Sequence, residues 1–239
     1  MINNSPSAFV LVGPTASGKS SVAQFLAEQM GAPMVSADSM NIYRGMDIGT
    51  AKPTAAERGT VAYHGIDLVD PTDSFSVGDW LNAVRPVFQG LEKTAILAGG
   101  TGLYIKCLLA GLDEMPAANE ALRARAEKMS LAELQDEARA AAPEAYASLS
   151  DNENPRRLVR LLEHGGLPQK KKVELPTVVG LHVEREELLK RIAARVDQMY
   201  AHGLIEEARG LIDLELSVTA QKAIGYAEAF AILKNEMTE

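Results

Sequence analysis

Short apolar runs alternate with segments of helical periodicity along most of the chain. Four runs have the length and composition of buried strands, at residues 8–12, 32–37, 94–98 and 177–183. Residues 18–30 repeat apolar side chains at helical spacing, and Gly31 predicts the end of that helix. Strands that alternate with helices are typical of βαβ units. We therefore predict an α/β fold, a mostly parallel sheet flanked by helices, with the carboxyl ends of the strands on one edge.

The middle of the chain has a different pattern. After residue 111 the sequence is rich in alanine and charge, and no strand pattern returns before residue 155. We interpret residues 113–155 as a small helical insertion into a core domain formed by residues 1–112 and 156–239. Helices are expected at residues 120–129, 131–142, 184–200 and 204–214.

The composition is that of a globular protein, with 46% hydrophobic and 23% charged residues. A formal net charge of −8 argues against nucleic-acid binding through bulk positive charge, but it leaves room for a local basic groove. The single cysteine, Cys107, cannot form an internal disulfide, so a reducing compartment is expected. The first residues lack the basic and apolar segments of a signal peptide. We therefore expect a monomeric cytoplasmic protein that does not contact a membrane.

A glycine-rich loop follows the first predicted strand and opens the first predicted helix. It matches the pattern G-x-x-x-x-G-K-[ST] and consists of Gly13, Pro14, Thr15, Ala16, Ser17, Gly18, Lys19 and Ser20. Such a loop turns its backbone N–H groups around a phosphate, and the helix N-terminus adds partial positive charge. Lys19 supplies a full charge, and the Ser20 hydroxyl can bind Mg²⁺. We predict a site for a diphosphate or nucleotide with Mg²⁺. The alternative is a plain glycine-rich turn. Such a turn does not require a strand before it and a helix after it.

Two more predicted strands end at the same edge of the sheet. Asp38 follows the second strand, and the glycine-rich sequence GGTG, which contains Thr101, follows the third. Ligands in open α/β sheets bind at such ends, so we expect both residues beside the phosphate loop. The alternative role for Asp38 is a helix cap or a turn. The third strand does not end in the metal-binding carboxylate of P-loop ATPases and kinases, which disfavours those activities.

The residues that begin at Asp38, DSMNIYRGMDIGTAKP, resemble the corresponding segment of the tRNA dimethylallyltransferase family. The resemblance spans residues 8 to about 230 and continues with GPTASGKS at Gly13, YHGIDLVDP at Tyr63, GGTGLY at Gly99, NPRRLVRLLE at Asn154 and AIGYAEA at Ala223. It implies a P-loop NTPase-like fold. It also implies that the dimethylallyl group of dimethylallyl diphosphate is transferred to N6 of the tRNA adenosine next to the anticodon (position 37), with release of pyrophosphate.

The resemblance also implies roles for individual residues. Asp38 matches the family's general base, Thr15 the threonine that hydrogen-bonds the bridging oxygen, and Arg123 a position that touches the tRNA or the reacting groups. The implied tRNA contacts are Asp38, Ser39, Met40, Asn41, Thr101, Arg123, Arg156, Arg157, Leu158, Val159 and Arg160. The family usually has Gln where Asn41 stands. Arg195, in contrast, looks structural rather than catalytic.

Two alternatives to tRNA prenylation remain. The same chemistry can use a free adenine nucleotide, as in adenylate isopentenyltransferases, or the chain can be a non-catalytic relative that binds RNA or nucleotides. The segment NPRRLVRLLE and Arg123 favour the tRNA enzymes. The presence of Asp38 together with an intact phosphate loop argues against a non-catalytic protein. From the residues alone, the arginines of NPRRLVR also fit a solvated charged face.

Overall fold

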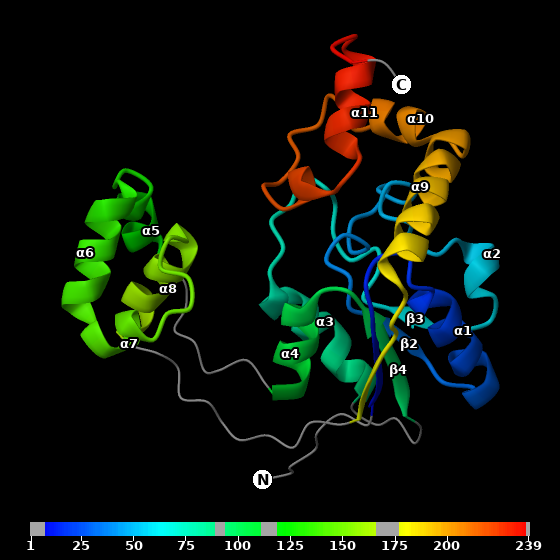
Figure 1. The fold of residues 1–239 in the computed structure, drawn as a ribbon, viewed down its shortest axis with the longest axis horizontal. Helices are drawn as coiled ribbons and strands as arrows, with labels where there is room; N and C mark the ends of the chain where they lie inside the picture. The colour runs from blue at the N-terminus through cyan, green and yellow to red at the C-terminus, as the bar shows by residue number, and fades with distance from the viewer. Residues whose placement is uncertain (1–7, 89–93, 111–118, 166–176, 238–239) are drawn as a thin grey trace. The chain divides into compact units, whose positions relative to one another are not determined.

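The computed structural model describes residues 8–88, 94–110, 119–165 and 177–237. The chain divides into two compact units (Figure 1). The core unit consists of Met1–Gly111 and Val173–Glu239, and the helical unit consists of Leu112–Lys172.

The core unit is built on one parallel sheet of five strands in the order β3-β2-β4-β1-β5. The strands are β1 (Ala8–Val12), β2 (Met34–Ser36), β3 (Tyr63–His64), β4 (Ala95–Gly99) and β5 (Val178–Gly180). The predicted parallel α/β fold is confirmed; β1, β2 and β5 fall within predicted runs, and β4 overlaps its run but extends one residue further, to Gly99. Two features differ from the prediction. β3 was not predicted because it has only two residues, and β5 is a partly exposed edge strand.

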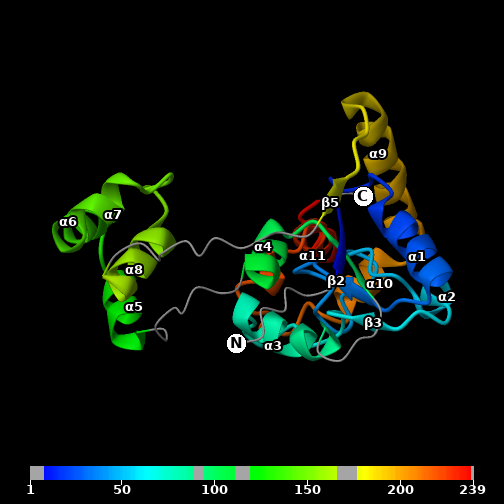
Figure 2. The same cartoon turned by 90° about the horizontal axis from the view of Figure 1, so that it is seen from below.

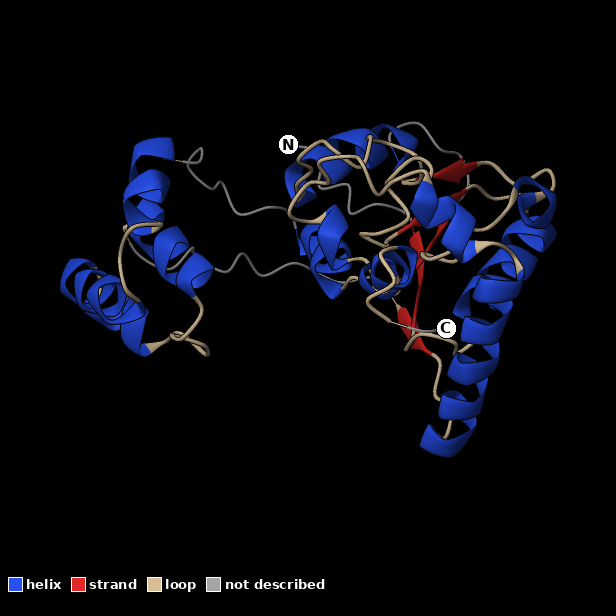
Figure 3. Ribbon diagram, turned by 90° about the horizontal axis from the view of Figure 1, so that it is seen from above, coloured by secondary structure: helices blue, strands red, loops and turns tan. Residues whose placement is uncertain are grey.

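Helices cover both faces of this sheet, which forms a single layer (Figures 2 and 3). The helices are α1 (Lys19–Met30), α2 (Ala55–Arg58), α3 (Val77–Phe88), α4 (Gly102–Ala110), α9 (Arg185–Ala201), α10 (Leu204–Arg209) and α11 (Tyr226–Leu233). Alternate side chains of β1 enter different cores. Val10 belongs to the larger cluster with α3, α4, α10 and α11, whereas Leu11 packs against α1.

Helix α1 packs on the sheet through small residues. Ala23 and Ala27 are fully buried, whereas Phe25 is 59% exposed. The predicted helix is therefore confirmed, but its apolar repeat does not mark its buried face. Alanines on that face allow close approach to the sheet, and α1 starts directly after the phosphate loop. This packing fixes the loop against β1.

The helical unit contains α5 (Glu120–Ala126), α6 (Leu131–Ala141), α7 (Pro143–Ala147) and α8 (Pro155–His164), and its described residues form no strand. The predicted boundary after residue 155 was wrong, because α8 belongs to this unit rather than to the core. Leu158 and Leu161 of α8 are buried with Leu134 and Ala138 of α6. A helix with such an apolar face folds with the partner that buries it.

No helix in the described parts of the chain combines the length and apolar character that crossing a membrane requires.

Candidate active site

The phosphate loop connects β1 to α1 in a conformation suited to an anion. Ala16 and Gly18 have positive φ angles of 62° and 86°. Left-handed residues of this kind turn successive N–H groups into one concave surface. The Ser17 N–H donates to the Pro14 carbonyl at 3.3 Å, and a Cβ on Gly13 would lie 2.7 Å from Ser17 Oγ. A side chain at position 13 would therefore displace Ser17 Oγ from its present place in the loop.

Lys19 lies against this loop and interacts with two charges from other elements. Its Nζ donates to the Pro14 carbonyl at 3.4 Å. Burial lowers the pKa of Lys19, the Asp38 carboxylate raises it, and the Arg195 guanidinium lowers it further. Asp38 also raises the pKa of Arg195, although burial lowers that pKa more strongly. These three charged groups therefore lie in one electrostatic neighbourhood, and the parallel sheet places Asp38 and the phosphate loop at the same edge.

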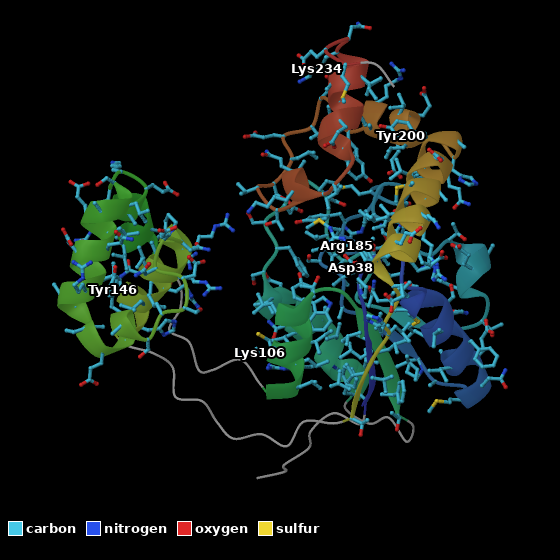
Figure 4. The ribbon with its side chains drawn as sticks, viewed as in Figure 1. Asp38, Lys106, Tyr146, Arg185, Tyr200 and Lys234 are labelled. Carbon is cyan, nitrogen blue, oxygen red and sulfur yellow. The ribbon has the colours of Figure 1, made fainter. Side chains whose placement is uncertain are left out.

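Asp38 lies just beyond the carboxyl ends of the strands (Figure 4). Its Oδ1 accepts the Met40 N–H at 2.9 Å, which orients the carboxyl group. In the described parts of the chain, the second oxygen of Asp38 has no hydrogen-bond partner. The half-buried carboxylate is thus fixed through one oxygen and can accept a proton through the other.

Thr101 joins the loop after β4 to the loop after β2. Its Oγ1 accepts the Ser39 N–H at 3.0 Å and donates to Ser39 Oγ at 3.2 Å. The Thr101 N–H donates to the Ala37 carbonyl at 3.0 Å. A Cβ on Gly99 would lie 2.2 Å from that same carbonyl oxygen, so only glycine allows this approach. Thr101 and the residues after Asp38 are therefore brought together, as predicted.

Two buried polar atoms at this site have no hydrogen-bond partner within the described residues. They are Ser17 Oγ, in the phosphate loop, and Asn41 Oδ1, three residues after Asp38. The backbone of Asn41 is fixed, because its carbonyl accepts the Asp67 N–H at 3.1 Å. Unpaired buried polar atoms are rare, and each can bind a ligand or water.

Arg195, which the sequence suggests is structural rather than catalytic, lies within electrostatic reach of Lys19 and Asp38. It is half-buried on α9 and forms no ion pair with any described residue, yet its charge acts on both Lys19 and Asp38. Helical periodicity could place Arg195 on an amphipathic helix, but not at the edge of the sheet. Residues 195–199 have the pattern R-x-D-x-M, which indicates no particular chemistry by itself.

The helical unit holds two of the predicted arginines against one buried carboxylate. Glu163, whose side chain is 1% exposed, accepts Arg123 Nε at 2.8 Å and an Arg160 guanidinium N–H at 2.6 Å. Burial raises the pKa of Glu163, but the hydrogen bonds from Arg123, Arg160 and the Asn119 N–H outweigh it and lower the pKa to about 2. Arg123 therefore lies in the helical unit with a structural partner, and its catalytic role stays a prediction.

The rest of the predicted tRNA set divides by exposure. Arg156 and Arg157 are exposed, and Arg157 donates to Ser150 Oγ at 2.8 Å. Val159 is half-buried. Leu158 is fully buried in the core of the helical unit, so its prediction as an RNA contact was wrong. Leu158 supports the arginines through packing.

The donors at the site fit a magnesium ion that arrives with a diphosphate. Ser20 is exposed at the start of α1, next to Lys19, and its hydroxyl offers a hard oxygen ligand. Among the described residues, no cluster of three or more His, Cys, Asp or Glu side chains could hold a metal ion. Mg²⁺ commonly keeps waters and takes most of its other ligands from substrate phosphates, so one protein hydroxyl suits it.

The chain matches known proteins over nearly all of its length. The family described as IPP transferase matches residues 41–239, and the family described as isopentenyl transferase matches residues 6–62. The tRNA dimethylallyltransferase of Streptomyces griseus is 40% identical and is aligned over 99% of this chain and 81% of its own length. That of Geobacter metallireducens is also 40% identical, with 96% and 81% covered.

Solved structures give the same result. The tRNA isopentenylpyrophosphate transferase of Bacillus halodurans is 35% identical with a TM-score of 0.68, over 98% of this chain and 79% of that protein. A eukaryotic dimethylallyltransferase acting on tRNA has a TM-score of 0.78 over 96% of this chain and 66% of its own. At 19% identity this second likeness concerns the fold alone. From its sequence relatives, its fold and its site, the chain belongs to the IPP transferase family.

Proposed function

We propose that this protein transfers the dimethylallyl group of dimethylallyl diphosphate to N6 of the adenosine next to the anticodon of tRNA, and releases pyrophosphate. The observation that carries the proposal is the electrostatic neighbourhood of Asp38, Lys19 and Arg195 at the carboxyl edge of the sheet. A base for the acceptor and cations for a leaving diphosphate are the two requirements of this reaction.

The phosphate loop is the proposed site of the donor diphosphate. Its backbone N–H groups, Lys19 and Arg195 stabilise the negative charge that grows on pyrophosphate as the carbon–oxygen bond breaks. Thr15, in the same loop, is the candidate for a hydrogen bond to the bridging oxygen. Mg²⁺, held by Ser20, would neutralise part of the diphosphate charge when bound.

Asp38 is the proposed general base. The lone pair of the adenosine N6 is delocalised into the purine, so the nitrogen attacks well only if its proton is removed as the new bond forms. The carbon–nitrogen bond forms, the carbon–oxygen bond breaks, and the N6 proton passes to the free oxygen of Asp38. Ser39, Met40 and Asn41 form the proposed pocket for the base, which must leave its stack to react.

The arginines of the helical unit are proposed to bind the tRNA. Arg156 and Arg157 are exposed, and their planar, positively charged guanidinium groups can each donate two hydrogen bonds to an RNA phosphate. Arg123 and Arg160 present the guanidinium groups that Glu163 holds in place. A local basic surface of this kind is compatible with a net charge of −8.

We also propose that the enzyme acts in the cytoplasm as a monomer. A tRNA substrate is consistent with that compartment, and so is a buried lone cysteine, Cys107, within α4. Asp38, Lys19 and Arg195 all belong to one chain, so the proposed chemistry requires no second copy.

One assay separates this function from the adenylate alternative. Purified protein is incubated with Mg²⁺ and labelled dimethylallyl diphosphate, with tRNA in one tube and AMP in another. We expect label in tRNA and none in AMP. Label in AMP alone would move the assignment to a free-nucleotide enzyme, and label in neither would contradict a prenyl transferase.

A further inference from the structure

The loop that begins at Asp38 forms no helix and only one isolated bridge, between Tyr43 and Val69, so side chains add to the few backbone hydrogen bonds that hold it. This acceptor loop, residues 38–52, contains Ile42, Tyr43 and Met46, which are fully buried. At its start, Thr101 binds Ser39. The proposed base and the adenosine pocket lie at this end, so a fixed loop favours a fixed acceptor site.

A buried lysine fixes the far end of the acceptor loop. The Lys52 side chain is 3% exposed, and its Nζ donates to the Tyr43 carbonyl at 2.5 Å. It also binds the carboxylates of Asp47 at 2.5 Å and Asp67 at 2.7 Å. All three donor directions of the ammonium group are used, so this end of the loop has a defined shape.

Three successive N–H groups of the acceptor loop converge on one carboxylate from α10. Glu207 accepts the Asp47 N–H at 2.9 Å, the Ile48 N–H at 2.8 Å and the Gly49 N–H at 3.1 Å. Hydrogen bonds to an ionised group are about twice as strong as neutral ones. The backbone N–H groups of residues 47–49 therefore bind the Glu207 carboxylate much as a phosphate loop binds an anion.

Tyr226, the first residue of α11, completes the contact. It is 1% exposed, and its hydroxyl donates to Glu207 Oε1 at 2.5 Å. A Cβ on Gly49 would lie 2.5 Å from the Tyr226 ring, so the ring packs directly on the loop backbone. Burial and the Glu207 carboxylate raise the pKa of Tyr226, which keeps the hydroxyl protonated as a donor.

We propose that Glu207 is a positioning residue for the acceptor: its bonds to three loop N–H groups hold the acceptor loop so that Asp38 and the adenosine pocket keep their geometry. The inference rests on the proposed prenyl transfer to tRNA. Among the described residues, Glu207 forms no hydrogen bond or ion pair with the phosphate loop. Loss of its charge therefore affects the tRNA side of the reaction and leaves the diphosphate side intact.

The test compares Glu207→Gln with Glu206→Gln in the full chain. Both residues lie on α10, but Glu206 is exposed and, among the described residues, pairs only with Arg209 of its own helix. In Glu207→Gln we expect a KM for tRNA at least about tenfold higher, since several charge-assisted bonds are lost, with KM for dimethylallyl diphosphate unchanged. Tyr226→Phe, which removes one hydroxyl, should shift KM for tRNA in the same direction by less.

Amide hydrogen exchange of residues 46–50 gives a second readout that needs no activity. Faster exchange there in Glu207→Gln, together with unchanged affinity for inorganic pyrophosphate, supports the proposal. If Glu207→Gln behaved like Glu206→Gln, or raised both KM values equally, Glu207 would have no positioning role. If Glu207→Gln does not fold, Tyr226→Phe decides by the same criteria. A wild-type chain that prenylates no tRNA would contradict the proposed function, while the exchange result would still test the contact.

Discussion

Asp38 stands in the electrostatic field of two cations that come from distant parts of the chain. Lys19 belongs to the phosphate loop, and Arg195 belongs to α9. At the scale of single residues, this arrangement separates two tasks. The cations favour negative charge on the donor, whereas the oriented carboxylate takes the proton from the acceptor.

Arg195→Ala is expected to lower kcat by about 10²- to 10³-fold, because a preorganised charge next to a leaving diphosphate is lost. The matched control is Arg191→Ala, one turn earlier on α9, where the arginine is exposed and pairs with Glu187. Steady-state transfer to tRNA measures both variants. Equal activity of the two would return Arg195 to a structural role.

Gly99 and Gly100 offer a second residue-scale prediction. A Cβ on Gly99 would meet the Ala37 backbone at 2.2 Å, whereas a Cβ on Gly100 meets nothing within 4 Å. We expect Gly99→Ala to destabilise the protein by about 2 kcal/mol or more through overpacking, and Gly100→Ala to be near neutral. Thermal unfolding compares them, and similar Tm values would mean that the two loops do not approach as described.

At the scale of elements, apolar runs and the glycines that end them predict the positions of the strands better than they predict the buried faces of the helices. β1, β2 and β4 coincide with short apolar runs to within one residue, so the sequence places the phosphate loop, Asp38 and Thr101 at one edge. The two-residue β3 could not be predicted, since pairing with β2 rather than its own pattern makes it a strand. The buried face of α1 could not be predicted either, because alanines carry it.

The site was predictable only where a motif follows a strand. Arg195 comes from a helix whose pattern shows amphipathicity but not its neighbours. Leu158 has arginines as sequence neighbours. On a helix of 3.6 residues per turn, however, its side chain lies on the face that packs into the core of the helical unit. Contacts between distant segments, such as that of Glu207 with the acceptor loop, leave no local signal at all.

The stability of the helical unit should depend on pH through Glu163 of α8. The pKa of Glu163 falls from an ordinary 4.5 to about 2 in the folded state, so its ionisation stabilises the fold above pH 4.5. That contribution is lost as pH falls from 4.5 towards 2. We expect Glu163→Gln to be less stable than wild type at pH 7, by roughly 3 kcal/mol, with the difference shrinking in acid.

Urea unfolding at several pH values, followed by circular dichroism, measures this difference. Asp136→Asn is the control, because Asp136 is exposed and its one ion pair within the described ranges is with Arg139 of α6. A Glu163→Gln deficit that did not change with pH would show that ionisation of Glu163 does not stabilise the unit.

At the scale of the whole molecule, an acidic chain is proposed to bind an acidic polymer. The proposal places tRNA binding on a few arginines of the helical unit, while the core unit carries the chemistry. The affinity for tRNA should then depend on salt through a small number of phosphate contacts.

Arg156→Ala tests this directly, since Arg156 is exposed and its side chain has no ion pair with any described residue. We expect weaker tRNA binding at low salt and a slope of log K against log salt that is smaller by about 1. The difference in tRNA affinity between wild type and Arg156→Ala therefore becomes smaller as the salt concentration rises. Binding measured by filter retention at four salt concentrations gives both slopes, and parallel lines would mean that Arg156 touches no phosphate.

The role of Asp38 as general base is tested most directly by the rate of transfer of Asp38→Asn at saturating tRNA and dimethylallyl diphosphate. The affinity of the variant for pyrophosphate is measured alongside. We predict a rate lower by about 10²- to 10⁴-fold, the range that a general base contributes. Affinity for pyrophosphate should be retained or increased, because a negative charge near Lys19 is removed. Transfer at the wild-type rate would contradict the account, as would a loss of pyrophosphate binding that matched the loss of rate.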